Sequence, residues 1–380
     1  MSAAAPRRVI YLSGTRADFG LMRSTLTRIG ATPGLELSIA ATAMHLSAEH
    51  GNTIEEIRAS GLPICGEIPL DMRTRTGQSM ALGIAEALRG TTELLARDRP
   101  DFLLLLGDRG EMLAGAIAAL HVGIPCVHIH GGELSGTVDE PVRHAISKLS
   151  SYHFVATAGS RERLLRMGEQ EARIFVTGAP GLDGLAQSGA MPREECLHAL
   201  GLPDQPFVLA VFHPVVQQAA QAGAQVRAVL HALKAVGLPA LWLEPNADAG
   251  SREILQALDE TPLPAGSRRL THVPRPLFAA ALRHCEVLVG NSSSGIIEAA
   301  TFGTPVVNIG DRQRLRERNA NVLDAPAESG AIEAGVRAML SHGRWPCDNL
   351  WGDGQAGGRI AALLATLPSG PSVLEKVNSY

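Results

Sequence analysis

Ionisable side chains gather in a short stretch that directly follows an apolar run. The stretch contains His128, His130, Glu133 and Asp139, with Arg143 four residues after Asp139. Paired carboxylates beside an arginine suit proton transfer, because a neighbouring positive charge keeps a carboxylate ionised and burial tunes its pKa. These residue types at this spacing favour general acid/base chemistry.

Two other interpretations of this stretch stay open. His128, His130 and either Glu133 or Asp139 have the residue types of a zinc site, and His-x-His is a common metal pair. The structural alternative is a helix capped by Asp139, with the two histidines in the core. Four ionisable groups within one strand-end stretch favour chemistry over packing alone.

A carboxylate and a guanidinium also follow the apolar run at 102–106. Asp108 and Arg109 stand in the sequence Gly-Asp-Arg-Gly-Glu at 107–111, where a strand is expected to end. The same sequence is typical of a helix cap, so alone it does not identify a site. If Asp108 and Arg109 lie near the acid/base stretch, their two charges add to that site.

Other segments carry the donors that a phosphate group needs. Arg16 follows the first apolar run, at the start of an expected helix where an anion is favoured. The alternative there is a surface arginine with Asp18 as the N-cap. Ser292 and Ser293, in Gly-Asn-Ser-Ser-Ser-Gly at 290–295, offer hydroxyl and N–H groups before a second helix.

More positive charge follows the next apolar run. Arg312 and three further arginines end at Arg318, although a solvated basic surface explains the outer ones equally well. Glu298, one turn into the preceding helix, is placed to accept two vicinal ribose hydroxyls. The serines at 290–295 could instead serve only as a helix cap, but together these segments predict a diphosphate site.

The elements that must position these groups alternate between strand and helix along the chain. Such alternation is typical of an α/β fold with parallel sheets covered by helices, which binds ligands beyond the carboxyl ends of its strands. The predicted strands are 8–13, 102–106, 125–130, 152–157, 173–177, 207–212, 240–244, 286–289 and 305–309. The predicted helices are 79–96, 111–121, 140–149, 217–236, 277–283, 295–302 and 357–367.

Composition bounds the partners and the cofactors. The 380 residues are 45% hydrophobic and carry a net charge of −4, so no basic excess exists for nucleic acid. No apolar run approaches the roughly 20 residues that cross a bilayer, and a cytoplasmic protein without a membrane partner is expected. Five cysteines without a CxxC pair predict neither disulfides nor structural zinc. GxGxxG and GxxxxGK[ST] are both missing, so no NAD, P-loop nucleotide or other cofactor is expected.

Taken together, the motifs closely resemble those of the hydrolysing UDP-N-acetylglucosamine 2-epimerases of sialic and legionaminic acid biosynthesis. The resemblance runs in order from about Val9 to Gly358. It is carried by GTRADFG, HLS, GDRGE, HIHGGELSGTVDE, RHAISKLS, FHP, PNADAGS, GNSSSGIIEAATFG, GDRQRLRERNANVLD and NLWGDGQAGGRI.

The resemblance implies two Rossmann-like, doubly wound domains with an interdomain cleft, as in GT-B glycosyltransferases. Gly and Pro interrupt the pattern at 178–206, so we expect an N-terminal domain at 1–180 on the sugar and catalytic side and a nucleotide-binding domain at 181–358. The sequence leaves open whether the helix and tail at 359–380 pack back on the first domain. A homodimer or a dimer of dimers is implied, with neither metal nor NAD in the reaction.

The resemblance also assigns residues by position. The catalytic positions are Asp108, Arg109 and Asp139, and His130 stands where mammalian and non-hydrolysing relatives have a glutamate, with Glu133 nearby. The base at C2 is therefore open among His130, Glu133 and Asp139. Nucleotide positions are Arg16, His213, Ser292, Ser293 and Arg312 for the diphosphate, Glu298 for the ribose, the Val273 backbone for the uracil, and Asn246 along the cleft.

The implied reaction converts a UDP-HexNAc, UDP-GlcNAc first, to UDP and a free ManNAc-type sugar through a 2-acetamidoglucal. The same reaction on UDP- or GDP-2,4-diacetamido-2,4,6-trideoxyglucose is an alternative. A non-hydrolysing epimerase would keep the nucleotide attached, and a glycosyltransferase would need an acceptor. A noncatalytic nucleotide-sugar binding protein would bind without turnover, which the acid/base stretch argues against.

Overall fold

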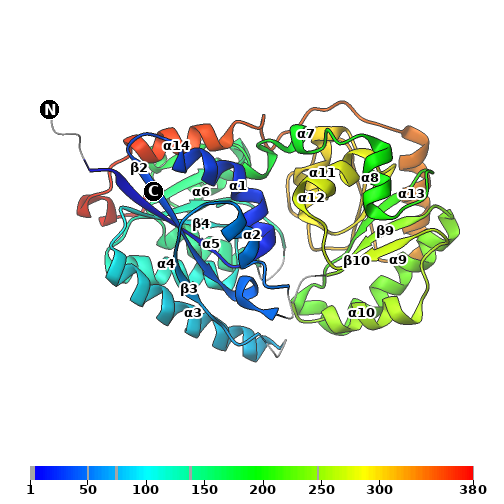
Figure 1. Ribbon diagram of the computed structural model, residues 1–380, viewed down its shortest axis with the longest axis horizontal. Helices are drawn as coiled ribbons and strands as arrows, with labels where there is room; N and C mark the ends of the chain where they lie inside the picture. Colours follow the sequence, from blue (N-terminus) through cyan, green and yellow to red (C-terminus); the bar gives the residue numbers. More distant parts are fainter. Residues whose placement is uncertain (1–4, 49–50, 73–75, 137–138, 246–247, 380) are drawn as a thin grey trace. The chain divides into compact units, whose positions relative to one another are not determined.

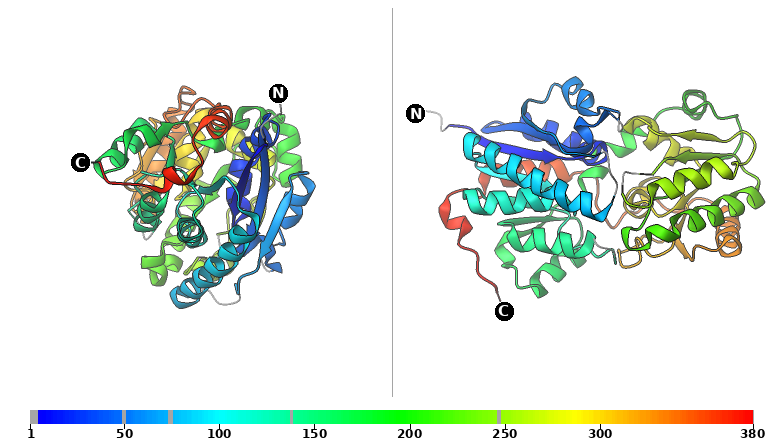
Figure 2. Two further views of the ribbon diagram at one scale, coloured as in Figure 1. Left: turned by 90° about the vertical axis from the view of Figure 1, so that its left-hand side faces the viewer. Right: turned by 90° about the horizontal axis from the view of Figure 1, so that it is seen from below.

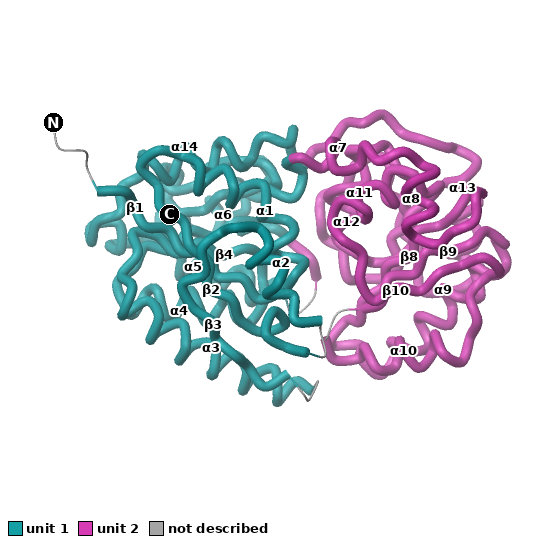
Figure 3. The backbone as a smooth tube through the Cα atoms, viewed as in Figure 1, with its two compact units in different colours: residues 1–133, 139–183, 351–380 teal, residues 134–138, 184–350 magenta. Residues whose placement is uncertain are grey.

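The chain divides into two compact α/β units (Figure 1, Figure 3). The computed structural model describes residues 5–48, 51–72, 76–136, 139–245 and 248–379. The first unit comprises Met1–Glu133, Asp139–Asp183 and Trp351–Tyr380, and the second comprises Leu134–Val138 and Gly184–Leu350. Each unit has its own parallel sheet and its own core.

The first unit is built on a parallel sheet of seven strands among the described residues, in the order β3-β2-β1-β4-β5-β6-β7. The order reverses direction beside β1, so β1 and β4 flank the point where ligands bind in open α/β sheets. The strands are β1 (Arg7–Ser13), β2 (Leu35–Thr42), β3 (Ile64–Ile68), β4 (Phe102–Leu106), β5 (Cys126–Ile129), β6 (Tyr152–Val155) and β7 (Ile174–Val176).

Helices cover both faces of this sheet because its strands are apolar on both sides. Val9 and Tyr11 of β1 pack with helices α1, α2 and α14, while Ile10 and Leu12 pack with α3, α4 and α5. Figure 2 shows α3 and α4 side by side. The helices of the unit are α1 (Arg16–Gly30), α2 (Ile54–Ala59), α3 (Gly77–Asp98), α4 (Gly110–Val122), α5 (Asp139–Leu149), α6 (Ala158–Arg166) and α14 (Ala356–Thr366).

The second unit repeats this plan with a shorter parallel sheet, ordered β10-β9-β8-β11-β12-β13. One face packs on α9, α10 and α13, and the other on α8 and α11. The strands are β8 (Val208–Val211), β9 (Ala240–Leu243), β10 (Arg268–Leu270), β11 (Val287–Gly290), β12 (Val306–Ile309) and β13 (Val322–Ala325). The helices are α7 (Leu185–Ser188), α8 (Arg193–Leu200), α9 (Ala222–Val236), α10 (Ser251–Glu260), α11 (Arg275–His284), α12 (Ser293–Ile297) and α13 (Ser329–His342).

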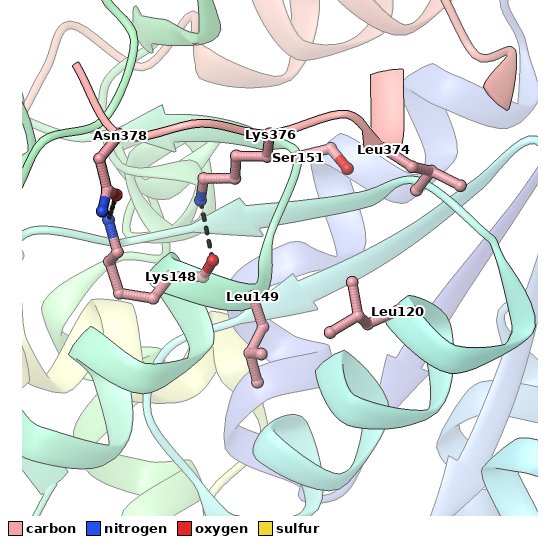
Figure 4. A pocket seen from close by; sticks show the side chains of 7 residues that line it. All are labelled: Leu120, Lys148, Leu149, Ser151, Leu374, Lys376 and Asn378. Atoms are coloured by element: carbon pink, nitrogen blue, oxygen red, sulfur yellow. Dashed lines mark hydrogen bonds between the residues drawn. The ribbon is translucent and has the colours of Figure 1, made fainter. Parts of the chain in front are cut away.

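The end of the chain returns to the first unit. Helix α14 packs along α1, and Gly357 lies so close to Thr25 that an added Cβ would be 3.0 Å from the Thr25 Cα. The following segment, 368–379, which we call the C-terminal strap, continues past the end of α5. There Lys148 of α5 and Lys376 and Asn378 of the strap line a small pocket with Leu120 (Figure 4).

The prediction of two parallel α/β sheets is confirmed, with differences in detail. The predicted strands all overlap observed ones, but four observed strands, β2, β3, β10 and β13, were not predicted. The predicted helix at 295–302 is wrong in its bounds. Helix α12 ends at Ile297, and a separate 3-10 turn follows at Ala299–Phe302. Among the described residues, no helix has both the length and the apolar character needed to span a membrane.

Candidate active site

The acid/base residues of the first unit lie at the carboxyl ends of two neighbouring strands. Asp108 follows β4 and His130 follows β5, and the two strands pair in parallel register. Helix α5 crosses this edge and contributes Arg143, whose side chain is 1% exposed. Arg143 Nη2 donates to Asp108 Oδ2, and Arg143 Nη1 donates to the Glu133 carbonyl at 3.0 Å. One buried guanidinium therefore joins the β4 loop to the β5 loop.

His130 and Glu133 form the second contact of this cluster. His130 Nδ1 hydrogen-bonds Glu133 Oε1, and the two side chains are 11% and 1% exposed. The backbone of His130 has a φ of 65°, which is unusual for a residue with a Cβ. Such strained residues concentrate at functional sites, where surrounding contacts hold them in place. The pair is thus held rigidly beside the Asp108–Arg143 pair.

His128 lies within β5, and its contacts are structural. Its Nε2 donates to the Gly107 carbonyl at 2.7 Å, and its Nδ1 accepts from the Ser147 hydroxyl at 2.9 Å. Burial lowers the pKa of His128 to about 3, so the ring is neutral. Both ring nitrogens already have protein partners, so the zinc interpretation that required His128 as a ligand does not fit this geometry.

Asp139 is the first described residue of α5, one turn before Arg143. The sequence suggested that Arg143 would hold Asp139 ionised. In the structure the Arg143 guanidinium donates to Asp108 and to the Glu133 carbonyl. Helix α5 therefore carries one candidate acid/base group at its start and, one turn later, the residue that organises the others.

Arg16 lies at the carboxyl end of β1, as the first residue of α1. The N-cap is Thr15, and Asp18 is the third residue of a capping box, which corrects the interpretation of Asp18 as the cap. Asp18 Oδ2 also accepts from the Thr15 N–H at 2.7 Å, and burial raises the Asp18 pKa. Arg16 Nε lies 3.9 Å from Glu56 Oε1. These contacts fix the loop that presents Arg16.

Arg109 turns toward the same strand end. Its Nε donates to Glu111 Oε1 at 2.7 Å, and the Glu111 side chain is 9% exposed. A Cβ on Gly14 would lie 2.5 Å from Glu111 Oε1, so a larger residue there would force the Glu111 side chain to move. Contact between Gly14 and Glu111 therefore brings the loops after β1 and β4 together, with Arg16 and Arg109 on them.

The nucleotide residues predicted in the second unit lie at the carboxyl ends of β8, β11 and β12. His213 follows β8, Ser292 and Ser293 follow β11, and Arg312 follows β12. Burial, and next the charge of Arg312, lower the pKa of His213 to about 3. His213 is therefore a neutral imidazole beside a cation, which suits it to donate a hydrogen bond to an anion.

The serine loop is the N-terminal cap of α12. The Ser292 hydroxyl accepts from the Ser294 N–H at 3.3 Å and bonds the Ser294 hydroxyl at 2.8 Å. The capping interpretation is therefore correct for Ser292, and it leaves the loop able to bind an anion as well. Arg312 Nη1 donates to the Asn291 carbonyl at 3.2 Å, next to the serines.

Glu298 lies at the junction between α12 and the following 3-10 turn. Its side chain is 6% exposed, and Oε2 accepts from Arg275 Nη1 at 2.5 Å. Burial raises the Glu298 pKa, and the charge of Arg275 opposes that rise. Val273 is buried two residues before Arg275. The predicted Asn246 lies outside the described residues.

Sequence reasoning singled out polar groups at the strand ends and missed the residues that hold them in place. The contact of Arg143 with Asp108 was not predicted, and Asn291 and Arg275 were not singled out. The sequence signal for Arg275 is weak, because it is only a basic residue that could pair with the buried carboxylate of Glu298. The contacts of Arg143 and Asn291 join segments far apart in sequence, so no spacing pattern reveals them.

Known proteins are similar in sequence to this chain over nearly its whole length. Residues 27–365 match the protein family described as UDP-N-acetylglucosamine 2-epimerase. The chain is 48% identical over 375 residues to the UDP-N,N'-diacetylbacillosamine 2-epimerase (hydrolyzing) of Legionella pneumophila, covering 98% of this chain and all of the relative. It is 31% identical to the GDP/UDP-N,N'-diacetylbacillosamine 2-epimerase (hydrolyzing) of Campylobacter jejuni, covering 84% of each.

A solved structure shares the fold. The crystal structure of UDP-GlcNAc 2-epimerase from Neisseria meningitidis bound to UDP-GlcNAc superposes with a TM-score of 0.78 at 18% identity, covering 94% of this chain and 99% of that one. At this identity the likeness supports the two-unit α/β architecture and nothing finer.

Proposed function

The chain belongs to the UDP-N-acetylglucosamine 2-epimerase family, as an enzyme of the hydrolysing type, and from that premise we propose that it converts a UDP-linked 2-acetamido sugar to UDP and the free 2-epimer. We propose that the second unit holds the nucleotide and that the first supplies the acid/base groups for the sugar. The observation that carries the proposal is the cluster of Asp108, His130 and Glu133 held around the buried Arg143.

The first chemical step is elimination. The C2 proton of an acetamido sugar is weakly acidic, so its removal requires that the C1–O bond to the diphosphate breaks in concert or first. Positively charged and neutral donors in fixed positions stabilise the departing charge. In this proposal Ser292, Ser293, His213, Arg312 and Arg16 have that role, and the product is a glycal with UDP.

The second step is hydration. Water adds to C1 of the glycal, and a proton returns to C2 on the face opposite to the one that lost it. The His130–Glu133 pair and Asp139 are the candidates for the base that removes the C2 proton. Asp108, paired with Arg143, is proposed to share protonation and water positioning with them.

The sugar is the finer part of the proposal. Both hydrolysing relatives described above carry UDP-N,N'-diacetylbacillosamine in their names, one of them at 48% identity over nearly the whole chain. We therefore place UDP-2,4-diacetamido-2,4,6-trideoxyglucose ahead of UDP-GlcNAc, the reverse of the order taken from motifs. The free product would then enter legionaminic rather than sialic acid synthesis.

A proton NMR time course in D2O tests the reaction and the sugar together. The purified protein is incubated in separate tubes with UDP-GlcNAc and with the UDP-linked 2,4-diacetamido sugar. We expect free, 2-deuterated manno-configured sugar and UDP, with the larger kcat/KM for the diacetamido substrate. Asp108→Asn is the matched variant and should slow turnover by about 100-fold or more.

Each contrary result has a defined meaning. A product that keeps its nucleotide would overturn hydrolysis in favour of the non-hydrolysing reaction. Faster turnover of UDP-GlcNAc would restore it as the preferred substrate. Turnover of a GDP-linked sugar alone would show that the assignment of uracil as the nucleobase is wrong. Unchanged turnover by the Asp108→Asn variant would remove Asp108 from the mechanism.

A further inference from the structure

We propose that Asn291 is a positioning residue that assembles the diphosphate-binding part of the second unit from three strand ends. The inference deepens the proposed function and rests on it, because it takes His213, Ser292 and Arg312 as the residues that meet the diphosphate. Asn291 itself is 1% exposed and is not among the predicted ligand contacts.

The side chain of Asn291 pairs with both polar groups of the His213 backbone. The His213 N–H donates to Asn291 Oδ1 at 2.7 Å, and Asn291 Nδ2 donates to the His213 carbonyl at 2.8 Å. A carboxamide is the shortest side chain with one donor and one acceptor in this arrangement. The pair fixes the turn after β8 against the turn after β11.

The backbone of Asn291 joins the third strand end. Its carbonyl accepts from Arg312 Nη1 at 3.2 Å and from Gln313 Nε2 at 3.1 Å, both from the loop after β12. Its N–H donates to the Val211 carbonyl at 3.1 Å. Three loops that each carry a proposed diphosphate ligand therefore converge on one residue.

Close packing at Gly290 makes this convergence possible. The residue has a φ of 147°, and an added Cβ would lie 2.0 Å from the Val211 oxygen. Only glycine allows β11 to approach β8 so closely at its end. Asn291, the next residue, is thereby placed directly beside the His213 peptide.

A positioning role affects one part of the ligand more than another. Fixed loops reduce the cost of ordering the donors when the diphosphate binds, so loss of the amide should weaken diphosphate binding. The Arg275–Glu298 pair, proposed to meet the ribose, has no contact with Asn291 among those found in the described residues. Uridine binding should therefore change little.

Isothermal titration calorimetry with UDP and with uridine tests this separation. For Asn291→Ala we expect a loss of UDP affinity of about 10- to 100-fold, and a change in uridine affinity of less than about threefold. Asn321→Ala is the matched control, because Asn321 is also a buried asparagine and its Nδ2 donates to the Thr304 carbonyl at 2.6 Å, before β12. The control should lower the melting temperature but keep the ratio of the two affinities.

Asn291→Asp supplies a signature that a general loss of stability does not produce. Below its pKa the introduced carboxyl has an O–H that can donate to the His213 carbonyl, as the amide does. Burial beside a carbonyl oxygen raises the pKa of this carboxyl. Above that pKa one carboxylate oxygen still accepts from the His213 N–H, but the other places a negative charge against the His213 carbonyl and near the proposed diphosphate site. We expect the UDP affinity of this variant, divided by that of the wild type at the same pH, to rise as the pH falls from 8 to 5.5.

The outcomes separate this inference from the proposed function. A wild type that binds neither UDP nor uridine would overturn the proposed function itself. A wild type that binds UDP, with Asn291→Ala losing UDP and uridine affinity equally, would overturn only the role of Asn291. A flat pH profile for the Asn291→Asp ratio would do the same.

Discussion

At the scale of single residues, the candidate site is organised by contacts between loops and a helix. Arg143 binds Asp108 and the Glu133 carbonyl, and its side chain is almost completely buried. A buried guanidinium needs charge and hydrogen-bond partners, since its desolvation is otherwise very costly. The sequence revealed all of these ionisable groups by type. It did not reveal the pairing, which depends on how α5 lies over β4 and β5.

Arg143→Met should inactivate the enzyme more than it destabilises it. Loss of the guanidinium removes the group that positions Asp108 and fixes the Glu133 loop, so we expect kcat to fall by about 100-fold or more. Breaking a fully buried ion pair costs about 3–5 kcal/mol. Asp108 is partly exposed and can be solvated, so the loss of stability in this variant should be smaller. Steady-state kinetics and circular dichroism melting measure the two effects.

The control for this prediction is Arg97→Met, which breaks an exposed ion pair with Asp98. Exposed pairs contribute little, and this variant should match the wild type in kcat. Wild-type kcat in the Arg143→Met variant would show that Asp108 works without its partner.

A buried histidine and a half-buried one make the fold sensitive to mild acid. Burial lowers the pKa of His128 and of His213 to about 3, below the 6.5 of an unfolded histidine. The unfolded chain therefore binds protons first, and stability is lost as the pH falls from about 6.5 toward 3. We expect the melting temperature to decrease steadily between pH 7 and pH 4.5. His128→Asn should reduce that slope, and an unchanged slope would contradict the role of this ring.

At the scale of elements, the sequence predicted the strands whose apolar runs are continuous. It missed β2, whose sequence LELSIAAT ends in small residues with weak strand preference, and β10, whose sequence RRL is short and charged. These strands form because neighbours in the sheet pair with them, which is tertiary information. The predicted helix at 295–302 is in fact two short elements, because the α-helix ends at Ile297 and the chain continues from Glu298 into a 3-10 turn.

The turn after β5 depends on one glycine. Gly132 has a φ of 74°, and an added Cβ would lie 2.4 Å from the Ser160 carbonyl oxygen of α6. We expect Gly132→Ala to destabilise the first unit by about 2 kcal/mol or more, because strain and a backbone clash add. Urea unfolding followed by circular dichroism measures the loss.

Gly83→Ala is the matched control, because Gly83 lies inside α3 and an added Cβ would meet no neighbouring atom within 4 Å. It should stabilise the protein by about 0.5–1 kcal/mol through helix propensity. Equal effects of the two substitutions would show that the turn has room to adjust.

At the scale of the whole chain, two units with the same plan were predictable because both follow from the alternation of strands and helices. The path of the chain was not. Helix α14 and the C-terminal strap belong to the first unit although more than 160 residues of the second unit precede them. Their attachment depends on buried partners in α1 and α5, which no local pattern specifies.

The strap is anchored by a lysine that meets a buried carboxylate. Lys376 Nζ donates to the carbonyls of Ser147, Lys148 and Ser150 at 2.8–3.0 Å, which caps the end of α5. It also lies 2.6 Å from Glu169 Oε2, and the Glu169 side chain is fully buried (Figure 4 shows the lysine). Hydrogen bonds from His153, Lys148 and Lys376 outweigh burial and lower the pKa of Glu169 to about 2.

Lys376→Met should therefore destabilise the first unit and change its response to acid. Lys148 still compensates Glu169, so we expect a cost of about 2–3 kcal/mol, at the lower end for a broken buried pair. The carboxylate contributes stability that is present above pH 4.5 and lost as the pH falls toward 2. A higher folded-state pKa in the variant makes this contribution smaller, so the variant should lose less stability in acid than the wild type does. Melting temperatures at pH 7 and pH 3 measure both effects.

Two further variants identify the cause. Lys376→Met combined with Glu169→Gln should recover part of the lost stability, because the uncompensated charge is then removed. Lys234→Met alters an exposed lysine on α9 and should leave the melting temperature within about 1 °C, as surface changes usually do. If the double variant is no more stable than the single one, the strap is held by the α5 carbonyls alone, and the charge of Glu169 has no part in closing the fold.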